Sequence, residues 1–206
     1  MKDMMFIIKI EVVPMIKPLY LFVGKSASGK TTIAELLEQK HGYKQVHSYT
    51  TRAPRYKGEI GHVFVTEEEF DDLEDLAAYT FYNNNHYGTT FKQLEECDIY
   101  VIDVAGVETL LQKNKINRQI VIIYFDTTVY TRINRMLDRH DGDMQIISRL
   151  LQDEQYDWFH RLDALVWHYE RINNKDVQLH SVNANGDQSD VLELVLYYMK
   201  QYVEDE

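Results

Sequence analysis

The sequence has one cysteine, three prolines and no long apolar run. Because Cys97 has no second cysteine to pair with, an intramolecular disulfide is excluded and a reducing, cytoplasmic location is expected. No run approaches the roughly 18 consecutive apolar residues of a membrane-spanning helix, so we expect no membrane association. Lys9 and Glu11 interrupt the apolar residues at the start, and no small-residue cleavage site follows. A signal peptide is therefore not expected.

A surplus of positive charge is also missing, because the formal net charge is −11 at pH 7. This charge argues against a surface that binds nucleic acid or anionic membranes. If so acidic a protein binds phosphorylated ligands, its cations must gather within about 8 Å of the phosphates, the Debye length in physiological salt. The positions of the arginines are therefore the best guide to a site.

The stretch from Leu19 to Thr32 reads LYLFVGKSASGKTT. Its first five residues are apolar or aromatic, which predicts a strand buried on both faces. The next eight match G-x-x-x-x-G-K-[ST] at every fixed position, and helix-forming residues follow from Ile33 to Gln39. A strand, a glycine loop and a helix in this order are the context that a P-loop requires. The stretch predicts a nucleoside triphosphate site, with a glycine turn that binds nothing as the alternative.

The expected chemistry of the loop follows from its residue types. Gly24 and Gly29 allow a tight turn in which backbone N–H groups point inward, and the start of the helix adds its positive end. Lys30 would reach the terminal phosphates of ATP, and the Thr31 hydroxyl would hold Mg²⁺. The residues expected to bind the nucleotide are Gly24, Lys25, Ser26, Ala27, Ser28, Gly29, Lys30, Thr31 and Thr32.

Strand and helix patterns alternate along the rest of the chain, and no Pro/Gly/Ser-rich linker divides it, which predicts one domain over residues 1–206. Further strands are expected at 43–47, 62–66, 77–82, 87–89, 99–104, 119–126 and 177–182. Helices are expected at 67–75, 107–112, 128–139, about 144–171 with a possible bend, and 189–203. Thr66 with Glu69 makes a capping box, and Ser189 is the expected cap of the last helix. The pattern predicts a three-layer α/β fold around a mostly parallel five-stranded sheet, with a polar, strand-rich insertion at 43–92.

Two segments of the insertion offer groups that bind phosphate. Arg52 and Arg55 are three residues apart on a loop, from 48 to 61, that Pro54 stiffens, and this arrangement suits a bidentate grip on a phosphate. A solvated loop with incidental arginines is the alternative. Tyr87 and Thr89 flank a glycine and offer a phenol and a hydroxyl, although this tripeptide alone would indicate only a turn.

The motifs together resemble guanylate kinase. The P-loop is followed in order by S-x-T-T-R-x-P-R-x-x-G-E, F-V-T-x-E-E-F, Y-G-T and I-D-x-x-G-V, and the resemblance covers about residues 19 to 150. It implies an ATP- and Mg²⁺-dependent nucleoside monophosphate kinase. The implied parts are a P-loop core at 19–42 and 93–206, a monophosphate-binding insertion at 43–92 and a helical lid at about 135–150.

The resemblance also implies roles for individual residues. On the acceptor side Ser48 would contact the base and the two loop arginines the phosphate, while Asp103 would lie near base and metal. Glu59 matches the family glutamate with one extra residue before it. The implied acceptor ligands are Ser48, Arg52, Arg55, Glu59, Tyr87, Thr89 and Asp103. A capping carboxylate is the alternative for Asp103.

The implied lid arginines are Arg135, Arg139 and Arg149, which would close over the donor phosphates and neutralise the moving charge. Arg135 is expected to bind the nucleotide. The implied catalytic residues are Lys30, Arg52, Arg55, Arg139 and Arg149. Solvated helix charges are the alternative for the lid arginines. Asp138, Asp141 and Asp143 lie among them, and their pairing would favour an open lid without ligand.

The sequence departs from the family where the base is read. Ala78 stands in place of the glutamate that reads guanine, His62 in place of a tyrosine, and Val101 in place of a further acid. A carboxylate is the natural partner for the N1–H and 2-amino donors of guanine. The candidate replacements are His62 and the amides of Asn83, Asn84 and Asn85. The residues thus support phosphate binding more strongly than a preference for guanine.

The expected function is the phosphorylation of a nucleoside monophosphate by ATP, with GMP or dGMP as the first candidates. The same machinery could serve another monophosphate or ribose bisphosphate. A non-catalytic interaction module is the third possibility, and the retained Lys30 and lid arginines argue against it. The expected partners are small-molecule nucleotides and no nucleic acid, in a monomer or homodimer.

Overall fold

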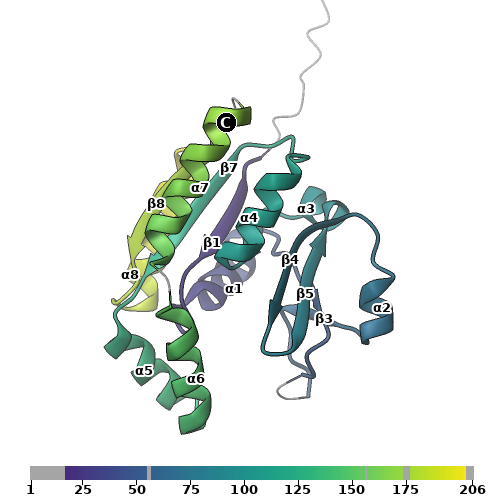
Figure 1. Ribbon diagram of the computed structural model, residues 1–206. Coiled ribbons are helices and arrows are strands. Elements are labelled where there is room, and N and C mark those ends of the chain that lie inside the picture. The colour runs from purple at the N-terminus through teal and green to yellow at the C-terminus, as the bar shows by residue number, and fades with distance from the viewer. Residues whose placement is uncertain (1–16, 55–56, 156, 174–176, 203–206) are drawn as a thin grey trace, which may run out of the picture.

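The computed structural model describes residues 17–54, 57–155, 157–173 and 177–202 (Figure 1). Three features of the sequence analysis lie outside the described residues. They are Arg55, the start of the chain that was examined for a signal peptide, and the expected end of the last helix at 203. In the part that is described, no helix is long and apolar enough to cross a membrane.

The core sheet is fully parallel, with the strand order β6-β1-β7-β8. Its strands are β1 (Leu19–Val23), β6 (Ile99–Val101), β7 (Ile120–Asp126) and β8 (Val177–Asn183). All five residues of β1 are buried, as expected for a strand that is covered on both faces. The prediction of a mostly parallel sheet is confirmed.

The strand predicted at 43–47 is wrong, so the described core sheet has four strands rather than five. Only Gln45 pairs, through an isolated bridge to Ile99, and Val46 N–H donates to the Ile99 carbonyl at 2.8 Å. The chain then leaves the core, because Ser48–Thr50 pairs with strands of a second sheet. This segment was expected to be part of a loop.

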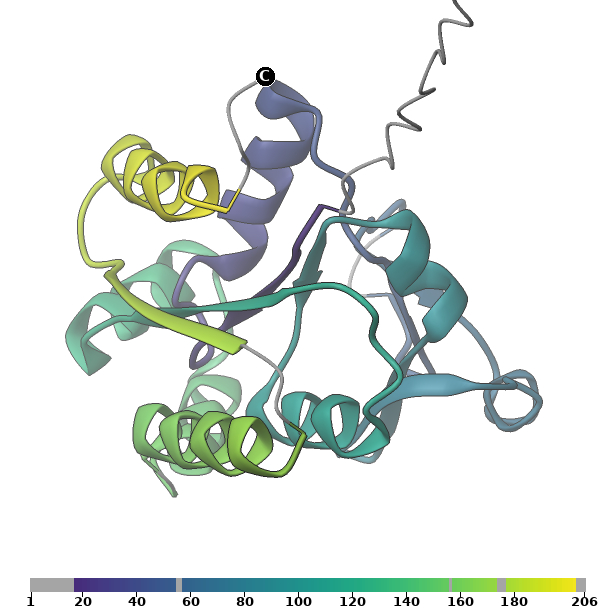
Figure 2. The ribbon, with the colours of Figure 1, turned by 90° about the horizontal axis from the view of Figure 1, so that it is seen from above.

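Two pairs of helices cover the core sheet, which confirms the three layers. The helices are α1 (Lys30–His41) and α8 (Gln188–Lys200) on one face, and α4 (Val104–Lys113) and α7 (Trp158–Asn173) on the other. Figure 2 shows the pairs on opposite sides of the strands. Alternate residues of β1 point to the two faces, so that Tyr20 belongs to the core cluster of Ile33 and Val195, whereas Leu21 belongs to that of Leu110.

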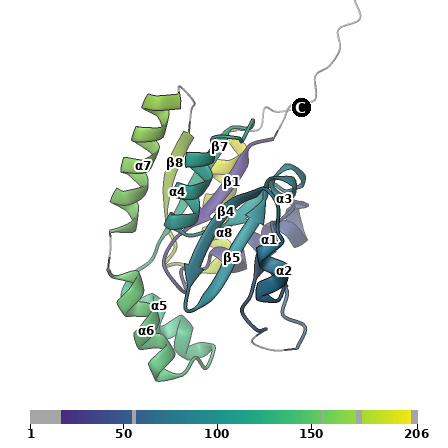
Figure 3. The ribbon, with the colours of Figure 1, turned by 45° about the vertical axis from the view of Figure 1, so that its right-hand side comes forward.

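A second sheet, with the order β3-β2-β5-β4, lies beside the core (Figure 3). Its strands are β2 (Ser48–Thr50), β3 (His62–Phe64), β4 (Leu76–Tyr82) and β5 (Asn85–Thr90), and its short helices are α2 (Glu67–Asp71) and α3 (Phe91–Glu96). The predicted asparagine turn joins β4 and β5. Asn83 and Asn84 both have positive φ, 49° and 57°, which a two-residue hairpin turn requires.

The helices that follow β7 differ from the prediction in two details. The helix expected at about 144–171 is divided into α6 (Asp143–Asp153) and α7, and α5 (Val129–Asp138) precedes them. The last helix is capped by Asp187 rather than by Ser189, without a side-chain bond. The capping box of Thr66 and Glu69 is confirmed at α2.

The side chain of Arg118 links two segments: the one that leaves the second sheet through α3, and the one that enters β1. Its guanidinium donates to the carbonyls of Lys17 and Pro18 before β1, and to those of Leu94 and Cys97 at the end of α3, all at 2.7–2.8 Å. The side chain is only 11% exposed. One side chain therefore fixes where the chain re-enters the core next to the strand that leads into the P-loop.

We expect Arg118→Met to lower the free energy of unfolding by at least about 4 kcal/mol, because four carbonyls lose their donor at about 1–3 kcal/mol each. Denaturation with urea measures the change. Lys115→Met is the matched control, since its ion pair to Asp75 is 61% and 58% exposed and should contribute under about 1 kcal/mol. Equal losses in the two variants would contradict the assigned role.

Candidate active site

The glycine loop after β1 is closely packed against β7. A Cβ atom at Gly24 would lie 2.9 Å from the carbonyl oxygen of Phe125, so this position accepts only glycine. Ala27 and Gly29 have left-handed backbones, with φ of 60° and 98°. Such residues within a tight loop turn successive N–H groups toward one point, which makes an anion-binding nest. Because α1 begins at Lys30, its positive end faces the same place.

The Lys30 side chain turns back over this loop. Its Nζ donates to the carbonyls of Gly24 at 2.6 Å and Lys25 at 2.9 Å, and to Ser28 Oγ at 3.2 Å. Burial lowers the pKa of Lys30 from its ordinary 10.5 to about 8, and the negative charge of Asp153 opposes this shift. The ammonium is thus held at the centre of the nest and is charged below about pH 8.

The side chain of Arg135, which α5 carries, lies against the outside of the loop. It donates to the carbonyls of Ser28 at 3.1 Å and Ala184 at 2.8 Å, and burial lowers its pKa. The sequence indicated that Arg135 binds the nucleotide. The structure places it beside the loop, and its role toward a ligand stays a prediction.

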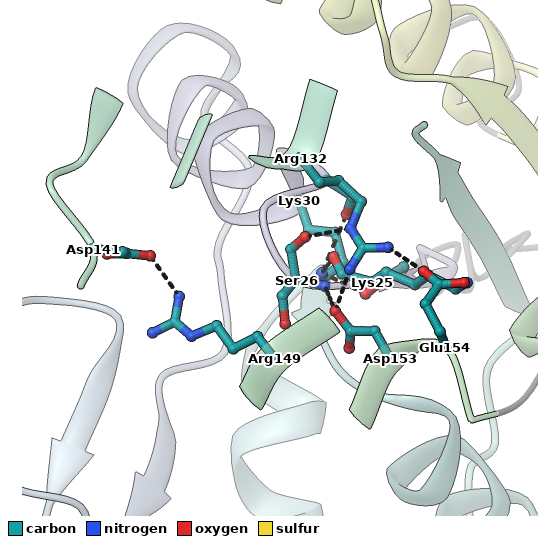
Figure 4. Close-up of polar contacts among 10 residues, drawn as sticks. Lys25, Ser26, Lys30, Arg132, Asp141, Arg149, Asp153 and Glu154 are labelled. Atoms are coloured by element: carbon teal, nitrogen blue, oxygen red, sulfur yellow. Dashed lines mark hydrogen bonds and ion pairs between the residues drawn. The ribbon is translucent and has the colours of Figure 1, made fainter. Parts of the chain in front are cut away.

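A second arginine of α5 contacts the loop and was not identified from the sequence. Arg132 is fully buried and pairs with Asp153 at 2.6 Å and Glu154 at 2.8 Å, at the end of α6. The backbone of Ser26 bonds to both Arg132 and Asp153. Lys25 of the loop pairs with Glu154 at 2.7 Å. Figure 4 shows these side chains converging on the loop. Asp153 and Glu154 lie at the negative end of α6, where two acids are unfavourable unless cations pair with them. This pair of acids was the signal in the sequence that a buried cation lies nearby.

Arg139 and Arg149 come together at a carboxylate. Both donate to Asp141 Oδ2, at 2.7 Å and 2.9 Å. Arg139 is 47% exposed and Arg149 is 18% exposed. Figure 4 shows Arg149 extending toward Asp141, away from the cluster at the loop. Of the expected acidic partners, Asp141 is therefore the one that holds both arginines.

On the acceptor side Arg52 is also paired with an acid. Its guanidinium makes two bonds to Glu59, at 2.9 Å and 3.2 Å, and stacks 5.3 Å above the Phe64 ring. Among the described residues, its buried Nε has no hydrogen-bond partner. The fork of Arg52 is thus already arranged for a planar anion.

Ser48 and Tyr87 both contact His62. Ser48 Oγ is 3.0 Å from His62 Nδ1, and the rings of His62 and Tyr87 are 5.9 Å apart. Ser48 itself is only 7% exposed. The histidine that replaces the family tyrosine therefore contacts two of the residues that were expected to hold the acceptor.

Ala78 and Thr89 face each other across β4 and β5 and lie in the interior of the second sheet. Ala78 is 1% exposed and Thr89 is fully buried. The Thr89 hydroxyl donates to Gln93 Oε1 at 2.8 Å. The expected role of Thr89 as a ligand stays a prediction.

The tip of the β4–β5 hairpin meets α6. Gln152 Nε2 donates to Asn83 Oδ1 at 3.2 Å. Figure 3 shows the hairpin extending toward the end of the molecule where α5 and α6 lie. The second sheet and the helices that carry the lid arginines are thus joined by a contact between uncharged amides.

The residues expected to hold Mg²⁺ offer oxygen ligands, which this ion prefers. Thr31 is exposed at the start of α1. Asp103 caps α4, and its Oδ1 accepts from the Gly106 N–H at 2.7 Å and the Thr80 hydroxyl at 2.8 Å. The described residues contain no group of three or more metal-binding side chains. A nucleotide-bound Mg²⁺ needs only one or two protein ligands, so these residues fit it.

Comparison with known proteins identifies the family, although no family model matches the chain. The guanylate kinase of Fusobacterium nucleatum is 34% identical, over 82% of this chain and 96% of the relative. That of Geobacter metallireducens is 30% identical, over 64% and 70%. A solved deoxyadenosine kinase from M. mycoides, with dCMP and dCDP bound, aligns with a TM-score of 0.43 and 15% identity, over 89% of this chain and all of that chain. The two sequence relatives show that the chain belongs to the guanylate kinase family and is a nucleotide kinase.

Proposed function

We propose that the protein transfers the γ-phosphoryl group of Mg-ATP to a nucleoside monophosphate, with GMP or dGMP as the preferred acceptor. The observation that carries this proposal is the pairing of the arginines. In a chain with a net charge of −11, Arg52, Arg139 and Arg149 are each held by a carboxylate near the P-loop core or its insertion. A carboxylate keeps the guanidinium fork in the geometry that a phosphate needs, and a phosphate can displace it.

The proposed roles follow from the geometry. Lys30 and the amides of the loop bind the donor phosphates, and Thr31 holds the metal, which neutralises charge on the phosphates when it is bound. Arg52 and Tyr87 orient the acceptor phosphate, while Arg139 and Arg149 neutralise the group in transit. The acceptor phosphate is already a nucleophile, so the protein contributes positioning and electrostatics rather than a general base.

A second acceptor is favoured by one observation. Position 78 offers no carboxylate to the donors of guanine, and its side chain is buried. A carboxylate does lie next to β4, but it belongs to Asp103, which accepts a hydrogen bond from Thr80 of that strand. Another monophosphate or ribose bisphosphate is therefore the alternative substrate for the same phosphate machinery.

The free thiol of Cys97 and the proposed use of ATP fit a reducing cytoplasm, which is the compartment we propose. A monomer or a homodimer is compatible with the proposed chemistry.

The acceptor is tested by coupled detection of ADP with GMP, dGMP, AMP, UMP, dTMP and ribose bisphosphate. We expect the highest kcat/KM with GMP or dGMP. Turnover with another acceptor alone would reject the guanine preference and keep the kinase. Lys30→Ala should lower kcat by at least about 10²-fold, because the developing charge loses a partly buried cation. Lys92→Ala, at an exposed position of α3, is the control.

Arg149→Ala should lower kcat by about 10³-fold, as expected for an arginine that stabilises the transition state. The KM for the acceptor should change little, because Arg149 is proposed to act on the moving group. Arg161→Ala is the matched control, since its pair with Glu108 at 2.7 Å joins α7 to α4. Steady-state kinetics measure both. An unchanged kcat in Arg149→Ala would remove this residue from the mechanism.

The pKa of Lys30 predicts the pH dependence of ATP binding. Lys30 loses its proton near pH 8 in the free protein, and bound phosphates favour the charged form and raise this pKa. Binding should therefore take up a proton above about pH 8, and affinity should fall as pH rises through this value. Calorimetry at pH 8.5 in buffers of different ionisation enthalpy measures the uptake. Lys30→Arg should show none, and no uptake by the parent protein would contradict the assignment.

A further inference from the structure

The backbone of Ser26 in the P-loop is held on both sides by one buried ion pair. Its carbonyl accepts from Arg132 Nε at 2.9 Å, and its N–H donates to Asp153 Oδ2 at 2.8 Å. Arg132 Nη2 and the same Asp153 oxygen are 2.6 Å apart. We name Arg132 and Asp153 the Ser26 clamp. Arg132 comes from α5 and Asp153 from α6, and Figure 4 shows both side chains at Ser26.

The clamp is an unfavourable arrangement unless it does more than stabilise the fold. Arg132 is 0% exposed and Asp153 is 2% exposed, so both charges have lost their water. Burying a charge pair is often no more stable than an apolar pair of the same size. Asp153 is also the last residue of α6, where the helix dipole opposes a negative charge. Stability alone therefore does not account for this pair.

Ala27, the residue after Ser26, has a strained backbone. Ala27 has φ of 60°, a left-handed conformation that a Cβ atom disfavours. Arg135 donates to the Ala27 carbonyl at 3.3 Å and to the Ser28 carbonyl at 3.1 Å. Contacts from outside the loop thus add to those that Lys30 makes within it, and they act next to the one non-glycine residue of the loop whose left-handed backbone is strained.

We propose that Arg132 and Asp153 are positioning residues for the donor triphosphate. By fixing the backbone of Ser26 they hold Ala27 in its left-handed conformation and keep the P-loop in its phosphate-binding shape. The inference rests on the proposed use of ATP as the donor. The loop amides are then arranged before the nucleotide arrives, so binding does not have to order them. Neither residue is assigned a contact with the substrate.

The first test separates positioning from stability. Asp153→Asn breaks the charge pair, and the double variant Arg132→Met/Asp153→Leu replaces it by apolar side chains. Calorimetry with Mg-ATP and no acceptor measures Kd, and calorimetric melting measures Tm. We expect Asp153→Asn to raise Kd at least 10-fold. The double variant should melt near the parent Tm and still bind ATP at least 10-fold more weakly. A double variant with the parent's Tm and the parent's Kd would overturn the proposal.

The second test uses the strain at Ala27. Glycine has no Cβ penalty in the left-handed region, so Ala27→Gly should restore ATP affinity about 3- to 10-fold when added to the double variant. This recovery should exceed the effect of Ala27→Gly in the parent, where the clamp already holds the loop. Equal effects in both backgrounds would show that the clamp does not act on Ala27 and would overturn the proposal.

The controls keep this inference apart from the proposed function. Glu108→Gln breaks the Arg161–Glu108 pair, which does not contact the loop, and should leave the Kd for ATP unchanged. In steady-state assays the clamp variants should raise the KM for ATP and leave the KM for the acceptor within twofold. If the parent binds ATP but phosphorylates no monophosphate, the proposed function fails, while the Kd values still decide on the clamp.

Discussion

The parallel pairing of β1 with β6 on one side and β7 on the other is the constraint on which the rest of the structure depends. It brings the carboxyl ends of the three strands to one edge of the sheet. The P-loop follows β1 there, Asp103 follows β6, and α5 follows β7. The helices after β1 and β6 cover opposite faces, α1 on one and α4 on the other. Ligands of open α/β sheets bind at such a switch point.

Charge is organised at this edge in pairs. Arg52, Arg132 and Arg149 each contact a carboxylate, although Arg52 and Arg149 are 14% and 18% exposed whereas Arg132 is fully buried. The pairs of Arg52 and Arg149, which keep some access to solvent, can be exchanged for a phosphate more easily than the fully buried pair at Arg132. We infer a division of labour in which the buried cation shapes the loop and the others bind ligands.

The sequence was sufficient where the determinants are local. The strand, glycine loop and helix between Leu19 and Thr32 and the capping box at Thr66 depend on spacings of a few residues, and both were predicted correctly. The strand at 43–47 was predicted wrongly, because distant parts of the same chain decide whether a short apolar segment pairs. Arg132 was missed for a similar reason. Its partners Ser26 and Asp153 are 106 and 21 residues away, and a buried arginine on a helix has the same sequence pattern as a solvated one.

The bond between Asn83 and Gln152 joins the second sheet to α6 through two neutral amides. Ionic strength screens contacts between charges and leaves a contact between neutral groups almost unchanged. Salt should therefore weaken the capture of phosphates by the arginines without altering how readily the hairpin separates from α6. Phosphate binding and the contact between the second sheet and α6 are therefore expected to respond differently to salt.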